Sequence, residues 1–98
     1  MEGNASVATD VVASYAADAA REVEGVAGLV EGRLPRQSAV RIGAEDGVTV
    51  ELHVALAWGA AAQEVGAEVQ QRVADYLERM AGSRPRSVDV VVDEIAAP

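Results

Sequence analysis

The chain contains one histidine, His53, which is the residue best suited to acid–base chemistry near neutral pH. A catalytic histidine needs a nucleophile and an orienting partner within hydrogen-bond reach. The sequence has no cysteine, and most of its serines fall at expected helix starts, in loops or at the edge of the last expected strand. We therefore interpret His53 as a surface or interface residue, and we predict that the protein is not an enzyme.

A set of acidic residues could gather near the ends of the expected strands: Glu45, Asp46, Asp89, Asp93 and Glu94. A calcium or magnesium site needs a tight set of oxygen ligands, such as the regularly spaced acids of a calcium loop. Glu45-Asp46-Gly47 has only the spacing of a turn. With one histidine and no cysteine, the chain cannot build a multi-histidine or thiolate metal site. We interpret these acids as a solvated surface and predict neither a metal site nor a cofactor.

The segment Gly25-Val26-Ala27-Gly28 matches the bare Gly-x-x-Gly of the KH domains that clamp an RNA backbone. Its middle residues are apolar, whereas such a clamp usually carries positive charge there. The flanking side chains of Glu22, Glu24 and Glu31 would repel phosphate. A turn that ends a helix is therefore the favoured interpretation of this segment.

The overall charge limits the classes of partner. Sixteen acidic against eight basic residues give a formal net charge of −8. This balance argues against binding to nucleic acid and against direct contact with an anionic membrane surface. No run of about 18 apolar residues could span a membrane, and the first residues lack the basic and apolar regions of a secretory signal. We expect a soluble cytoplasmic protein that neither inserts into a membrane nor binds nucleic acid.

The length of 98 residues predicts one domain, residues 1–98, with an ordered core over about 7–95. Half of the residues are hydrophobic, and most of these are alanine and valine, with no phenylalanine. The core is therefore expected to pack small side chains. The single tryptophan, Trp58, is expected to plug the end of this core.

The first expected helix runs from Ser6 or Thr9, either of which could cap it, to Val23. Apolar residues recur along it at steps of three and four, which is the pattern of one helical face. The glycines of the Gly-x-x-Gly segment are expected to end this helix. Residues 29–38 are expected to form a connector.

Two strands are expected next, over residues 39–44 and 48–58, joined by a turn at Glu45-Asp46-Gly47. In the second strand every even-numbered residue from Val48 to Trp58 is apolar. Strict alternation of this kind indicates a strand with one buried face and one open face.

A long helix is expected over residues 60–81, with Met80 on its apolar stripe and Gly82 at its end, and a last strand over residues 87–95. The order α-β-β-α-β predicts an α+β fold, a two-layer sandwich with both helices packed on one face of a three-stranded sheet. The pattern leaves open whether the last strand pairs with the first or with the second.

If both helices cover one face, the other face of the sheet stays open. We expect this open face to carry the candidate interface, formed by Arg41, Thr49, Glu51, His53 and Val91. Mixed polar and apolar faces with free sheet edges beside them can pair with another chain. Two alternatives remain: a KH-like nucleic-acid-binding domain, which the charge disfavours, and a small-ligand-binding domain, which would need a pocket with convergent polar groups.

Several short motifs are spread over most of the chain. They are Val12-x-x-Tyr15-Ala16-x-x-Ala19, Glu22-Val23-Glu24-Gly25-Val26, Val48-Thr49-Val50-Glu51-Leu52-His53-Val54, Ala57-Trp58-Gly59, Glu64-Val65, Val69-Gln70, Met80-Ala81-Gly82 and Val88-Asp89-Val90-x-Val92. Together and in this order they resemble the alkaline shock protein twenty-three / Gls twenty-four family of bacterial envelope stress response proteins. Gly66 departs from the family pattern, which usually has alanine there.

The resemblance implies a non-enzymatic protein, with no catalytic residue to carry over. It implies a role in cell-envelope stress as a protein–protein interaction or scaffold module. The implied partners are a second copy of the chain, which would give a homo-oligomer, and a membrane-anchoring protein. Such an anchor would hold the cytoplasmic protein at the inner face of the membrane.

Overall fold

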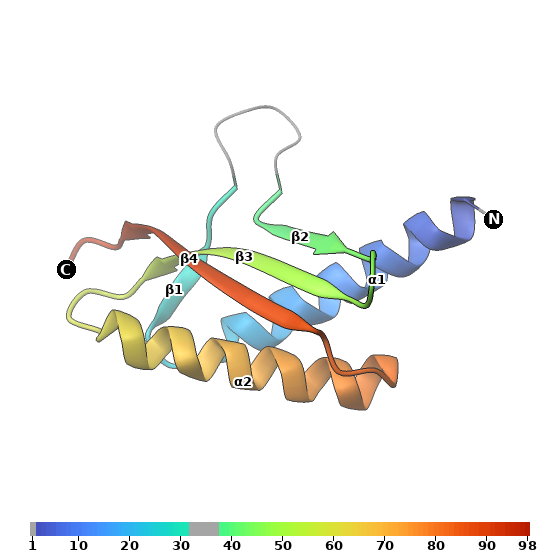
Figure 1. Ribbon diagram of the computed structural model, residues 1–98. Coiled ribbons are helices and arrows are strands. Elements are labelled where there is room, and N and C mark those ends of the chain that lie inside the picture. Colours follow the sequence, from blue (N-terminus) through green and yellow to red (C-terminus); the bar gives the residue numbers. More distant parts are fainter. Residues whose placement is uncertain (1, 32–37) are drawn as a thin grey trace.

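Two helices cover one face of a four-stranded sheet in the computed structural model, which describes residues 2–31 and 38–98, with side chains from Thr9 onward (Figure 1). The elements in chain order are α1 (Glu2–Arg21), β1 (Val26–Leu29), β2 (Val40–Gly43), β3 (Thr49–Leu56), α2 (Ala62–Ala81) and β4 (Ser87–Ile95). The predicted α+β sandwich with both helices on one face is confirmed. The prediction of three strands is wrong, because the sheet has a fourth strand, β1.

β3 is the central strand of the sheet. β4 pairs with it in parallel from Thr49 to Leu56. The other edge of β3 is shared, because β1 pairs antiparallel with residues 54–56 and β2 pairs antiparallel with residues 49–52. β1 and β2 therefore lie end to end, and the sheet is only three strands wide. The last strand pairs with the second of the predicted strands, which answers the question that the sequence left open.

β1 occupies the segment that we expected to be a helix-ending turn and the start of a connector. Gly25 does stand between α1 and β1, with φ +101°, but Gly28 lies within β1 and pairs with Ala55. A four-residue strand with a small residue at two of its positions offers too little alternation to be recognised. The central part of the expected connector, residues 32–37, lies outside the described residues.

The core lies between β3 and the two helices. Even-numbered residues of β3 point into it, and Val50, Leu52, Val54 and Leu56 are each at most 3% exposed, which confirms the predicted alternation. α1 contributes buried alanines and α2 contributes Val69, Val73 and Leu77 to the same cluster. Burial of each valine or leucine side chain contributes about 1.5–3 kcal/mol. The small side chains of α1 also let this helix approach the sheet closely.

The end of α2 agrees with the prediction, but two large side chains were misplaced. Gly82 has φ +80° and donates its N–H to the Glu78 carbonyl at 3.1 Å, as a helix-ending glycine does. Met80 is 46% exposed because the buried stripe of α2 ends at Leu77. Trp58 is 65% exposed and does not plug the core. It lies two residues beyond the end of β3, in the turn that leads to α2.

α1 begins earlier than expected. Ser6 and Thr9 both lie inside α1, so neither residue is its N-cap. The helix ends at Arg21, and Val23 is buried in the turn that follows. Where α1 and α2 meet, the rings of Tyr15 and Tyr76 pack edge to face with their centres 5.9 Å apart. Within the part of the chain that the structure describes, no helix has the length and apolar character needed to cross a membrane.

Candidate protein-interaction surface

The face of the sheet opposite the helices, called the outer face below, carries all five residues of the candidate interface. They are Arg41, Thr49, Glu51, His53 and Val91. The odd-numbered residues of β3 point to this face because the even-numbered ones are buried against the helices. The strand register aligns Arg41 and Glu51 with Asp89 in one row across the sheet, and it places His53 opposite Val91 in the next. Thr49 is the first residue of β3.

His53 is held between two carboxylates at the centre of the outer face. Its Nδ1 atom lies 2.7 Å from Asp93 Oδ2, and its Nε2 atom lies 2.7 Å from Glu51 Oε2. Arg41 extends the group, with its Nη1 atom 3.8 Å from the same oxygen of Glu51. A protonated imidazole can donate from both nitrogens, whereas a neutral imidazole can donate from only one. The geometry therefore suits the charged form of His53.

The two carboxylates raise the pKa of His53 above its ordinary value. The hydrogen bond to Glu51 is the largest cause and the hydrogen bond to Asp93 is the second, while partial burial of the ring acts in the opposite direction. A hydrogen bond to the charged form stabilises that form. His53 and the two carboxylates form a cluster, in which His53 and Glu51 lie on β3 and Asp93 lies on β4. It is thus a link across two strands of the sheet.

A β-bulge in β4 places Asp93 at His53. Val54 pairs with Val92, but the next residue of β3, Ala55, pairs with Glu94. Asp93 is therefore an extra residue in β4, and a bulge of this kind re-aims the side chain that it carries. From the sequence we interpreted Asp93 as one of several solvated acids and did not predict its contact with His53. The missing information was the parallel pairing of β4 with β3.

The backbone of His53 marks the junction between β1 and β2. Its carbonyl accepts a hydrogen bond from the N–H of Val30 at 2.8 Å, and its own N–H donates to the carbonyl of Ala39 at 2.9 Å. Both main-chain groups of His53 thus point to the same edge of β3. The His53 side chain and the junction are therefore tied to the same point of the central strand.

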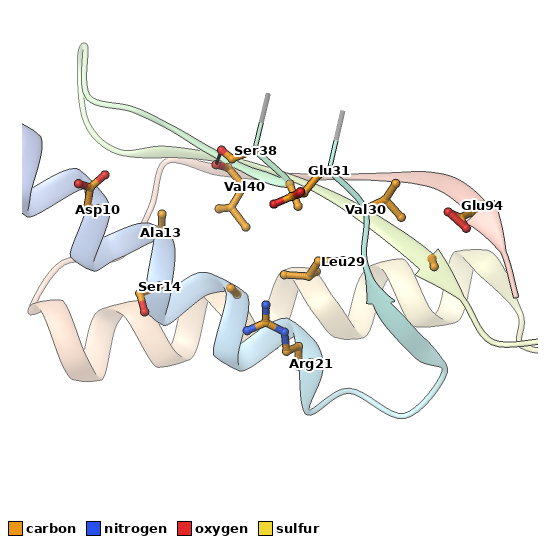
Figure 2. A pocket seen from close by; sticks show the side chains of 13 residues that line it. Asp10, Ala13, Ser14, Arg21, Leu29, Val30, Glu31, Ser38, Val40 and Glu94 are labelled. Atoms are coloured by element: carbon orange, nitrogen blue, oxygen red, sulfur yellow. Dashed lines mark hydrogen bonds between the residues drawn. The ribbon is translucent and has the colours of Figure 1, made fainter. Parts of the chain in front are cut away.

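The helix side of the sheet has a hollow of about 810 Å³ between α1 and the junction of β1 and β2 (Figure 2). Leu29 and Val40 line it from the strands, and Arg21 points into it from α1. Three carboxylates line this hollow and are spread along it, with Glu31 lying between Asp10 and Glu94 (Figure 2). Its carboxylates therefore do not converge as acid–base catalysis would need, and His53 is not among the residues that line it.

The acidic set and the Gly-x-x-Gly segment singled out in the sequence lie in separate parts of the fold. Glu45 and Asp46 lie in the turn between β2 and β3, where Asp46 has φ +55°, whereas the other three acids of the set lie on β4. Among the residues with described positions, no three histidine, cysteine, aspartate or glutamate side chains are placed to hold a metal ion. The two glycines of the Gly-x-x-Gly segment form no loop that could clamp a phosphate backbone, because Gly28 is part of β1.

Comparison with known proteins agrees with the resemblance carried by the sequence motifs. No curated protein and no solved structure matches the chain. A family model matches residues 1–97, and this family is described as having a cell envelope-related function. Because the match covers nearly the whole chain, the protein belongs to the alkaline shock protein 23 family.

Proposed function

We propose that the protein is a non-enzymatic interaction module in the response to cell-envelope stress and that it binds its partners through the outer face. The observation that carries this proposal is the group formed by Arg41, Glu51, His53 and Asp93 on a face that no described element covers. The family's cell envelope-related function supports the setting. A cytoplasmic protein of this kind would work at the inner side of the envelope.

The outer face suits a protein partner because its polar side chains are already held in place. Glu51 and Asp93 are fixed by His53, so these side chains would lose little conformational freedom when a partner binds. Val91 is 37% exposed beside them and offers an apolar contact. A surface with fixed charges around an apolar patch favours a specific protein over a small molecule.

A membrane-anchored protein and a second copy of the chain are the partners that fit this role. The net charge of −8 disfavours direct attachment to anionic lipid. Attachment through a protein that itself spans the membrane avoids this repulsion. In that arrangement the outer face supplies the contact and the helix side faces away from the anchor.

Reversal of charge on the outer face tests the proposal. We expect Glu51→Arg to reduce the share of the protein that sediments with the membrane fraction of stressed cells, because the substitution removes a partner of His53 and Arg41. Glu64→Arg is the matched control, since it makes the same change of charge on an exposed residue of α2. Thermal unfolding of both variants must first show that they fold. Equal membrane association of both variants and the parent chain would contradict the proposal.

A further inference from the structure

β4 is an edge strand: one of its edges pairs with β3, and none of the strands that the structure describes pairs with the other edge. It is nine residues long, and in Figure 1 it runs along the margin of the sheet above α2. Edge strands expose main-chain donors and acceptors that another chain can use. Val91, Val92 and Ile95 of this strand are 37%, 38% and 62% exposed. The edge therefore combines free backbone groups with accessible apolar side chains.

The hydrogen bonds of the sheet show which residues of β4 have free backbone groups. His53 directs its main-chain groups to β1 and β2, so the even-numbered residues of β3 must direct theirs to β4. Ala96 agrees with this, because its N–H donates to the Leu56 carbonyl at 2.8 Å. In a parallel pair, a residue whose main-chain groups point to the neighbouring strand forms hydrogen bonds with the two residues on either side of its register partner. Val90 and Val92 therefore present their N–H and carbonyl groups to the open edge.

Gln70 of α2 provides an independent check of this orientation. Its Nε2 atom donates to the carbonyl of Val88 at 2.9 Å, and Val88 has the same orientation as Val90 and Val92. α2 thus satisfies one outward carbonyl at the start of β4. The stretch that remains open runs from Val90 to Val92, just before the bulge.

The charges along this edge select the kind of strand that could be added. Asp89 and Asp93 lie on the outer face on either side of Val91, and Glu94 follows. A second copy paired about Val91 would place Asp89 directly opposite Asp93 twice, which is unfavourable. The net charge of −8 adds a general repulsion between copies. A basic segment would instead place opposite charges beside both aspartates.

The two faces of the added strand would differ because side chains alternate. Residues opposite Asp89 and Asp93 would lie on the outer face, where lysine or arginine fits. Residues opposite Val90 and Val92 would lie on the helix side, where Val92 is accessible. Valine or isoleucine fits there. The matching sequence pattern is thus a short alternation of basic and β-branched residues.

We propose that the open edge of β4 binds an extended, basic segment of a partner protein as an added strand. This inference rests on the proposed function, because it names the chemistry of one partner. Segments on the cytoplasmic side of membrane-spanning helices carry an excess of lysine and arginine. A membrane anchor therefore has a segment of suitable charge at the correct side of the membrane. The outer face remains free to contact the rest of the same partner.

Titration with a short peptide tests this assignment. The probe is a blocked heptapeptide of alternating lysine and valine, added to the full chain and followed by amide exchange. We expect the amides of Val90 and Val92 to become protected, because the added strand accepts their hydrogen bonds. The amides of Asp89 and Val91, which face β3, should change little. Binding should weaken about tenfold when salt is raised well above physiological strength.

Two control peptides and two protein variants separate strand addition from simple charge attraction. A peptide with glutamate for lysine and a peptide with proline for two valines should both fail to protect Val90 and Val92. Val92→Pro removes an outward N–H and should lower the affinity about tenfold or more, while Val92→Thr keeps the N–H and should bind like the parent chain. Both variants leave the hydrogen bonds to β3 in place.

Three results would overturn the assignment. The first is binding of the lysine peptide without protection of Val90 and Val92. The second is the absence of binding at low salt. The third is protection that rises with protein concentration in the absence of peptide, which would assign the edge to a second copy. None of these results decides whether Glu51→Arg disturbs membrane association, so failure here is distinguishable from failure of the proposed function.

Discussion

The two faces of β3 carry their side chains in strict alternation, but different forces hold them. On the helix side, Leu52 and Val54 are fully buried among apolar residues of α1 and α2. On the outer face, Glu51 and His53 are held by hydrogen bonds and ion pairs at partial exposure. Apolar burial contributes far more to stability than exposed ion pairs do. The comparison indicates that the helix side determines the fold and that the outer face is free to serve binding.

Truncation of a buried residue of β3 should give the largest effect. We expect Leu52→Ala to lower the free energy of unfolding by about 2–5 kcal/mol, because it leaves a cavity in a fully buried site. Its neighbour provides the control, since Glu51→Ala should cost at most about 1 kcal/mol. Chemical denaturation measures both. Similar losses for the two variants would break the distinction between the faces.

A glycine on the helix side should show the next largest effect. Gly25 has φ +101°, and a Cβ atom there would lie 2.5 Å from Cγ2 of Val65. We expect Gly25→Ala to lower the free energy of unfolding by about 1–3 kcal/mol, owing to strain and displacement of α2. Gly28→Ala is the matched control, because no heavy atom lies within 4 Å of its Cβ position. If both substitutions are tolerated equally, α2 does not pack closely on this turn.

The outer face should make a smaller contribution that depends on pH. The pKa of His53 in the folded protein lies above its ordinary value of 6.5. The stabilisation that the hydrogen bonds of His53 to Glu51 and Asp93 provide is therefore fully present below the pKa of the unfolded state. It should be lost as pH rises through the folded pKa. Denaturation between pH 5 and 9 should show this loss in the parent chain and a flatter profile in His53→Gln. A pKa of His53 at or below 6.5, measured by NMR titration, would contradict the contacts of His53 with Glu51 and Asp93.

The exposed tryptophan should contribute least. We expect Trp58→Ala to change the free energy of unfolding by no more than about 0.5 kcal/mol, because the side chain is 65% exposed beyond the end of β3. Thermal unfolding at neutral pH measures the change. A loss of several kcal/mol would show that Trp58 belongs to the core and that the buried face of the sheet extends beyond Leu56.

Regular patterns in the sequence predicted the elements with the strongest periodicity. The alternation around Leu52 placed β3 and both of its faces, and the helical stripe followed by Gly82 placed α2. β1 was not predicted because four residues with little alternation carry no such signal. Trp58 was misplaced because alternation alone does not show where a strand ends. These errors concern short segments and ends, where tertiary contacts decide the structure.

The candidate interface was predicted by the same alternation, but its internal contacts were not. Parity along β3 placed Glu51 and His53 on one face. The contact between His53 and Asp93 depends on parallel pairing and on a bulge in β4. A single sequence shows neither feature. The chemistry of the outer face could therefore be foreseen as a set of residues but not as a linked group.

In the proposed function the outer face, and not the helix side, contacts a partner at the cell envelope. In-cell photo-crosslinking distinguishes the two sides, with a crosslinking amino acid placed at Val91 on the outer face or at Glu64 on α2. We predict that the probe at Val91 forms a discrete adduct with a membrane protein during envelope stress and that the probe at Glu64 does not. An adduct formed only from Glu64, or equally from both positions, would contradict binding through the outer face.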